Sequence, residues 1–158
     1  MSSKLRVLIG EEQIATRVLE LGREISNDYP DDGSAIYLIG ILKGAVMFHA
    51  DLARAVERPV RMDFIGISSY GKGKTTSGQV KVTKDLDTSI EGANVVVVED
   101  IVDSGVTLTY LLQVLETRKP KSLAVATLLD KPERRMRPVT AKYVGFQIPD
   151  EFVVGYGL

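Results

Sequence analysis

The sequence has no cysteine and a single histidine, His49. Without cysteine, a disulfide scaffold, thiol catalysis and a thiolate metal site are excluded. No apolar run approaches the about 20 residues that span a bilayer, and the opening residues MSSKLRVLIGEE contain no apolar signal-peptide core. The formal net charge of -1 lacks the concentrated positive charge that nucleic-acid and membrane surfaces favour. We therefore expect a soluble protein of the cytoplasm.

The length and the hydrophobic pattern predict a single α/β domain over residues 1–158. Alternating helices and strands indicate a mostly parallel central sheet flanked by helices, with ligands bound beyond the carboxyl ends of the strands. Apolar residues at helical spacing predict helices at 11–25, at 44–57 and from Leu108 onward. Short apolar or alternating runs predict strands at 34–42, 60–70, 79–86, 94–101, 121–130, 142–149 and 152–158. The more polar run at 79–86 suits a sheet edge.

Four consecutive valines at 95–98 are followed at once by acidic residues. Glu99 and Asp100 end the strand on opposite faces, and Asp103 follows in the loop. Residues 104–107 then form the turn into a helix, where free N–H groups, two hydroxyls and the helix dipole suit a phosphate monoester. The carboxylates suit vicinal hydroxyls or a hydrated Mg²⁺, so a sugar phosphate would satisfy both halves. The alternative is a capped helix, with Asp103 or Ser104 as its N-cap.

The stretch VVVVEDIVDSGVTL resembles the phosphoribosyl-diphosphate-binding signature of the type I phosphoribosyltransferases. This resemblance implies that Glu99 and Asp100 hold the ribose hydroxyls and the Mg²⁺ environment. It further implies a cradle for the 5′-phosphate, made by Asp103, Ser104, Gly105, Val106 and Thr107. Asp103 would also be the catalytic residue, acting as general base or acid at the purine nitrogen of position 7.

Two further segments resemble loops of the hypoxanthine-guanine phosphoribosyltransferase branch. LIGILKGA is similar to the pyrophosphate loop, in which Lys43 supplies a cation, Gly44 lets the backbone approach a diphosphate, and the Leu42–Lys43 peptide is cis. ISSYGKGKTTSG is similar to the lid, whose Ser69 and Tyr70 close over the site and exclude water. The alternatives are a lysine at a strand end and a plain flexible loop.

LLDKP and IPDEFVVGYGL resemble the purine site of the same branch. The resemblance implies that Lys131 donates to the exocyclic oxygen of a 6-oxopurine, that Phe152 stacks on the ring and that the backbone of Val153 reads its edge. Taken alone, Phe152 would more often be a core residue and Lys131 a solvated turn lysine. His49 matches no role in the family, so we interpret it as structural.

The resemblance covers residues 38–158, with its four motifs in the family's order. It implies the type I phosphoribosyltransferase fold with a small hood formed by the chain ends, Mg²⁺ as cofactor, and a homodimer or homotetramer. The expected reaction is phosphoribosyl transfer to hypoxanthine or guanine; transfer to xanthine or a pyrimidine, or a nucleotide-responsive regulator with the same fold, remain alternatives. Members of the family continue past VVGYGL with a metal-binding aspartate and an arginine. Either this chain is cut short after Leu158, which we expect, or those groups are absent.

Overall fold

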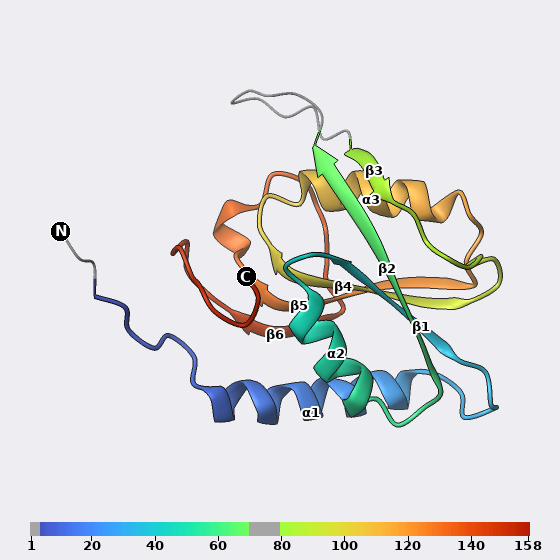
Figure 1. Cartoon of the computed structure of the whole chain (residues 1–158), viewed down its shortest axis with the longest axis horizontal. Coiled ribbons are helices and arrows are strands. Elements are labelled where there is room, and N and C mark those ends of the chain that lie inside the picture. The colour runs from blue at the N-terminus through green and yellow to red at the C-terminus, as the bar shows by residue number, and fades with distance from the viewer. Residues whose placement is uncertain (1–3, 70–79) are drawn as a thin grey trace.

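The computed structural model describes residues 4–69 and 80–158 of the chain and shows one six-stranded sheet between helices. In Figure 1, α1 and α2 lie below the sheet and α3 lies above it. The helices are α1 (Glu11–Asp28), α2 (Val46–Ala55), α3 (Val106–Glu116) and the 3-10 turn η1 (Pro132–Arg134). The strands are β1 (Ile36–Leu42), β2 (Val60–Ser69), β3 (Val80–Lys84), β4 (Asn94–Val102), β5 (Ser122–Asp130) and β6 (Tyr143–Gln147).

The strand order is β3-β2-β1-β4-β5-β6. All neighbouring pairs are parallel except β2 with β3, and β3 lies at the edge, which confirms the mostly parallel sheet and the polar edge strand. β4 lies between β1 and β5, so both of its edges are hydrogen-bonded to a neighbouring strand. The carboxyl ends of these three parallel strands therefore meet at one edge of the sheet.

The four valines of β4 are fully buried because each face of the sheet packs against a helical layer. Val96 and Val98 belong to the apolar cluster that includes side chains of α1 and α2, whereas Val95 and Val97 belong to the cluster with α3. Each fully buried valine stabilises the fold by about 1.5 kcal/mol or more relative to an exposed one. A strand buried on both faces reads as a continuous apolar run, which accounts for this part of the sequence.

The expected strand at 152–158 does not form. Gly155, Tyr156 and Gly157 have φ angles of 102°, 52° and 86°, in the left-handed region, which is incompatible with an extended strand. The Tyr156 hydroxyl donates a hydrogen bond to the Asp51 carboxylate on α2, so this segment packs against α2 instead of joining the sheet. The prediction of a seventh strand was therefore wrong.

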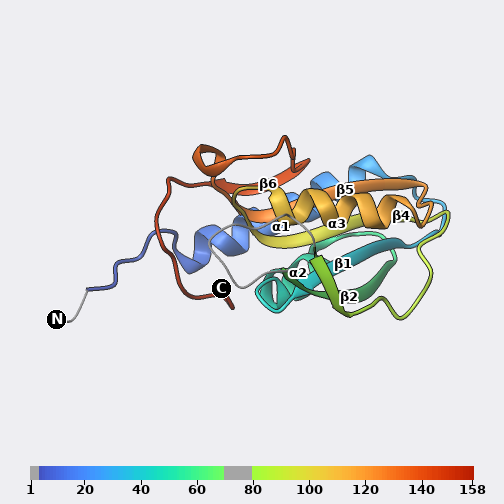
Figure 2. The same ribbon diagram turned by 90° about the horizontal axis from the view of Figure 1, so that it is seen from above.

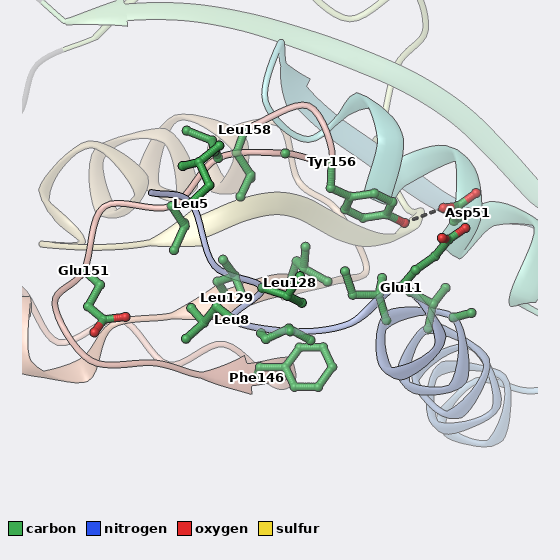
Figure 3. Close-up of a pocket in the computed structure, with 18 of the residues that line it drawn as sticks. Leu5, Leu8, Glu11, Asp51, Leu128, Leu129, Phe146, Glu151, Tyr156 and Leu158 are labelled. Atoms are coloured by element: carbon green, nitrogen blue, oxygen red, sulfur yellow. Dashed lines mark hydrogen bonds between the residues drawn. The ribbon is translucent and has the colours of Figure 1, made fainter. Parts of the chain in front are cut away.

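The first and last described segments, residues 4–10 and 148–158, lie at one end of the molecule, where the sequence predicted a hood (Figure 2). Arg6 Nη2 lies 3.3 Å from Glu151 Oε1, joining the first and last segments. Between these segments, α1 and the sheet lies a cavity of about 1190 Å³, into which Leu128, Leu129 and Phe146 project from β5 and β6 (Figure 3). Of the helices in the described ranges, none is long and apolar enough to span a bilayer.

Candidate active site

Three of the predicted segments meet at the carboxyl edge of the sheet. β1 ends at Leu42, directly before the predicted pyrophosphate loop. Val102 of β4 pairs in register with Asp130 of β5, so Asp103 and Lys131 leave neighbouring strands at the same level. The Lys131 N–H donates to the Val102 carbonyl at 2.9 Å and fixes this alignment past the last strand pair.

Glu99 and Asp100 are partly buried at the end of β4. Glu99 Oε1 accepts the Asp100 N–H at 3.0 Å, and Asp100 Oδ1 accepts the Ile101 N–H at 2.6 Å. Burial, and then the adjacent Asp100 carboxylate, raises the pKa of Glu99 well above its ordinary value. Burial and the like charge of Asp100 favour the neutral form of Glu99, whereas a cation placed beside the two carboxyl groups would favour the ionised form. This chemistry fits a magnesium-bound sugar.

The loop after β1 brings Gly44 against Asp100. The Leu42–Lys43 peptide is cis, as the resemblance implied, and Lys43 is exposed. A Cβ atom on Gly44 would overlap Asp100 Oδ2 and lie 2.9 Å from its Cγ. Only glycine therefore allows the predicted pyrophosphate loop to approach this carboxylate so closely.

The turn before α3 begins the helix with glycine rather than with a side-chain cap. Gly105 is the N-cap residue with φ of 81°, and the alternative prediction of Asp103 or Ser104 at that position was wrong. Ser104 Oγ accepts the Val106 N–H at 3.3 Å. Within the described residues, no acceptor takes the N–H groups of Gly105 or Thr107. Free N–H groups at the positive end of a helix dipole suit a phosphate.

Residues 134–137, which the sequence reasoning missed, hold this turn in place. The Ser104 carbonyl accepts the N–H groups of Met136 at 2.8 Å and Arg137 at 3.1 Å. Arg135 donates to the Asp103 carbonyl at 3.0 Å and also pairs with the buried Asp130 carboxylate. The only sequence signal was the basic run RRMR shortly after Lys131, and nothing in it indicated which loop it would contact.

The two predicted purine residues lie in different surroundings. Lys131 is buried beside the Asp103 loop and is not a solvated turn lysine. Phe152 is 93% exposed, so it is not a core residue either, and it borders the hood cavity with the partly buried Val153. The Ile148 N–H donates to the Asp130 carbonyl at 2.9 Å, which anchors the start of their segment at the end of β5.

The remaining sequence predictions concern the lid and the histidine. Ser69 is the last residue of β2, but its side chain, Tyr70 and the loop to Gly78 lie outside the described residues. His49 is fully buried, its Nε2 lies 2.9 Å from the Leu38 carbonyl, and burial lowers its pKa. Its place in the core agrees with a structural role.

The fold and this edge of the sheet define a class of protein. The family model of the phosphoribosyl transferase domain matches residues 10–158, and the chain belongs to that family. It is 52% identical to the hypoxanthine phosphoribosyltransferase of Salmonella typhimurium over 158 residues, covering 100% of this chain and 89% of the relative. It is 50% identical to the hypoxanthine-guanine phosphoribosyltransferase of Bacillus subtilis over 153 residues, covering 97% and 84%.

The structure is also similar to a solved member of the family. A crystal structure of a hypoxanthine-guanine phosphoribosyltransferase from Bacillus anthracis, with a HEPES molecule in its active site, superimposes with a TM-score of 0.92. The two sequences are 52% identical, and the match covers 98% of this chain and 90% of the other. Sequence and structure thus agree on the family and on the type I fold.

Proposed function

We propose that this protein is a purine-salvage enzyme, which transfers the phosphoribosyl group of 5-phosphoribosyl 1-diphosphate to hypoxanthine and guanine. The products are inosine or guanosine monophosphate and pyrophosphate. The observation that carries the proposal is the pairing of Val102 with Asp130, because it sets an acid and a buried lysine side by side next to a phosphate-binding turn. The named relatives at about 50% identity support the same reaction.

The phosphoribosyl group binds along the end of β4. The turn from Asp103 to Thr107 takes the 5′-phosphate through its free N–H groups and hydroxyls. Glu99 and Asp100 would hold the ribose hydroxyls and Mg²⁺, which proteins usually bind by one or two carboxylates plus ligand oxygens. Within the described residues, this adjacent pair near the end of β4 would supply the carboxylate oxygens for the ion.

The reaction breaks the bond between the anomeric carbon and the diphosphate and forms a bond to purine nitrogen 9. When bound, Mg²⁺ neutralises the charge that develops on the leaving diphosphate. Lys43 and the backbone at Gly44 bind the same diphosphate, while the carboxylates at the end of β4 stabilise the positive charge on the sugar. Asp103 exchanges a proton with purine nitrogen 7 and so tunes the attacking nitrogen.

Purine recognition comes from the ends of β5 and the hood segment. Lys131 donates to the 6-oxo group, Phe152 offers an exposed aromatic face for stacking, and the backbone of Val153 reads the ring edge. Ser69 and Tyr70 serve as the lid, and this role remains a prediction from the sequence. A homodimer or homotetramer is likewise expected from the family.

The experiment is a spectrophotometric turnover assay with hypoxanthine, guanine and xanthine, each with Mg²⁺ and with a chelator. We expect turnover of hypoxanthine and guanine that requires both Mg²⁺ and 5-phosphoribosyl 1-diphosphate. Turnover of xanthine alone would reassign the substrate. If no purine reacts but nucleic acid shifts in a gel-retardation assay, the protein is instead a regulator with the same fold.

A further inference from the structure

Arg134 connects two carboxylates that belong to different parts of the site. Its Nε donates to Asp103 Oδ1 at 2.6 Å, and its Nη1 donates to Asp150 Oδ2 at 3.3 Å. Asp103 follows β4 and is the first residue of the phosphate-binding turn, residues 103–107. Asp150 lies two residues before Phe152, in the segment that carries the predicted purine contacts. One side chain therefore joins the phosphate side of the site to the purine side.

The two ion pairs of Arg134 contribute little to the stability of the fold. The side chains of Arg134, Asp103 and Asp150 are 48%, 47% and 48% exposed, and ion pairs at such exposure contribute little to folding. A guanidinium, however, presents its N–H donors in a rigid planar fork. Two acceptors that bind different edges of this fork are fixed in direction and in separation.

The backbone beneath this contact is held independently of Arg134. Arg135 binds the Asp103 carbonyl, and the Met136 N–H binds the Ser104 carbonyl. The position of the loop therefore does not depend on Arg134, whereas the direction of the Asp103 carboxylate does. Within the described residues, the hydrogen bond from Arg134 engages Oδ1 and none engages Oδ2, which leaves Oδ2 available to a ligand.

We propose that Arg134 is a positioning residue, which aims the Asp103 carboxylate and sets the separation between the phosphate-binding turn and the purine-binding segment. This inference rests on the proposed function. If it is correct, the affinity for a ligand that spans both halves of the site depends on Arg134. The affinity for a ligand that occupies only the phosphate half does not.

Two ligands provide this comparison without any need for turnover. Inosine monophosphate spans both halves, whereas ribose 5-phosphate carries no purine. In Arg134→Gln, we expect calorimetry to show inosine monophosphate binding about three- to five-fold more weakly, which corresponds to the upper range of an exposed ion pair. The affinity for ribose 5-phosphate should stay within about two-fold, because its N–H cradle is held by other contacts.

The matched control is Arg118→Gln. Arg118 also forms an exposed pair, with Asp85 at 2.7 Å, but it lies just after α3, away from the carboxyl edge of the sheet. This control should lower the thermal midpoint about as much as Arg134→Gln does and leave both affinities unchanged. Arg134→Lys keeps the charge but not the fork, so it should recover only part of the lost affinity.

Coupling to the purine side is tested with Asp150→Asn. If both residues act through one contact, the double variant Arg134→Gln/Asp150→Asn binds inosine monophosphate no more weakly than Arg134→Gln alone. Additive losses would overturn the proposal, as would equal weakening of both ligands or no weakening of either. Failure of the proposed function is a separate result, since it would appear as absent purine turnover in the unmodified protein.

Discussion

Replacing Gly44 with alanine should damage the site while leaving the fold almost unchanged. The new Cβ would overlap Asp100 Oδ2 and lie 2.9 Å from Cγ, so the Asp100 carboxylate has to turn away. The atoms that must move are the far end of a side chain, not backbone. Gly44 is not among the glycines with φ in the left-handed region, so alanine adds no backbone strain there.

Two opposing effects set the change in stability. Turning Asp100 aside gives up its 2.6 Å hydrogen bond from the Ile101 N–H, at a cost of about 1 kcal/mol. Alanine in place of glycine restricts the unfolded chain and returns about 0.4–1 kcal/mol. The free energy of unfolding should therefore change by less than about 1 kcal/mol. The value of kcat/KM should fall about 100-fold, the effect of displacing a reacting or binding group by an ångström.

The assay combines urea denaturation with steady-state kinetics and uses Asp100→Ala as the reference background. If the clash is the cause, Gly44→Ala has no further effect on kcat/KM once the Asp100 carboxylate is gone. An equal loss in both backgrounds would mean that Gly44 acts through the diphosphate alone. A drop of several kcal/mol in stability would show that the loop, not the carboxylate, had been forced to move.

Three other substitutions separate the roles assigned to this edge of the sheet. Asp103→Asn should lower kcat by about 100-fold or more and change the KM for 5-phosphoribosyl 1-diphosphate much less, since proton transfer is lost while the cradle remains. Lys131→Ala should abolish turnover of hypoxanthine, because the 6-oxo group loses its donor. Glu99→Gln should make the protein more stable than the unmodified chain as the pH rises. Burial raises the pKa of Glu99, so the folded state loses stability as the pH climbs above the ordinary value near 4.5, and a neutral side chain avoids this loss.

For each of these three substitutions, a different result would contradict the role assigned to the residue. Equal losses in kcat and in diphosphate binding would reduce Asp103 to a binding residue. Unchanged hypoxanthine turnover in Lys131→Ala would refute the purine assignment. A stability difference between Glu99→Gln and the unmodified protein that does not vary with pH, measured by denaturation in a series of buffers, would show that the Glu99 carboxylate is not penalised by burial.

The sequence was sufficient to predict β4 and the acids at its end. Because parallel strands buried on both faces are uniformly apolar, the run of valines indicated a central strand, and the change to acidic residues at Glu99 marked its carboxyl end. Periodicity along the chain also predicted the helices and the polar edge strand. These features depend on neighbouring residues, so they can be read from a local pattern.

Contacts between distant loops could not be predicted in this way. The pairing of Arg134 with Asp103 joins residues 31 positions apart, and it depends on β5 lying beside β4. The segment FVVGYGL alternates like a strand, yet Tyr156 adopts a left-handed φ, and its hydroxyl binds Asp51 on α2. Residue type gives no warning of a left-handed tyrosine. Likewise, the exposure of the Phe152 side chain depends on where the C-terminal segment packs. A local sequence pattern does not predict that position.

The strand order has a consequence for how activity appears during folding. β4 inserts between β1 and β5, and the assigned site residues follow the ends of all three strands, from Lys43 to Lys131. No hairpin or single β-α-β unit contains the whole site. A sheet in which β1, β4 or β5 has not yet paired therefore lacks part of the site. Pairing strands that are far apart in the sequence is slow, because the chain loses conformational entropy before the stabilising contacts form. Recovery of catalysis after dilution from denaturant should therefore lag behind recovery of helical circular dichroism, which makes enzyme turnover a reporter of the completed sheet.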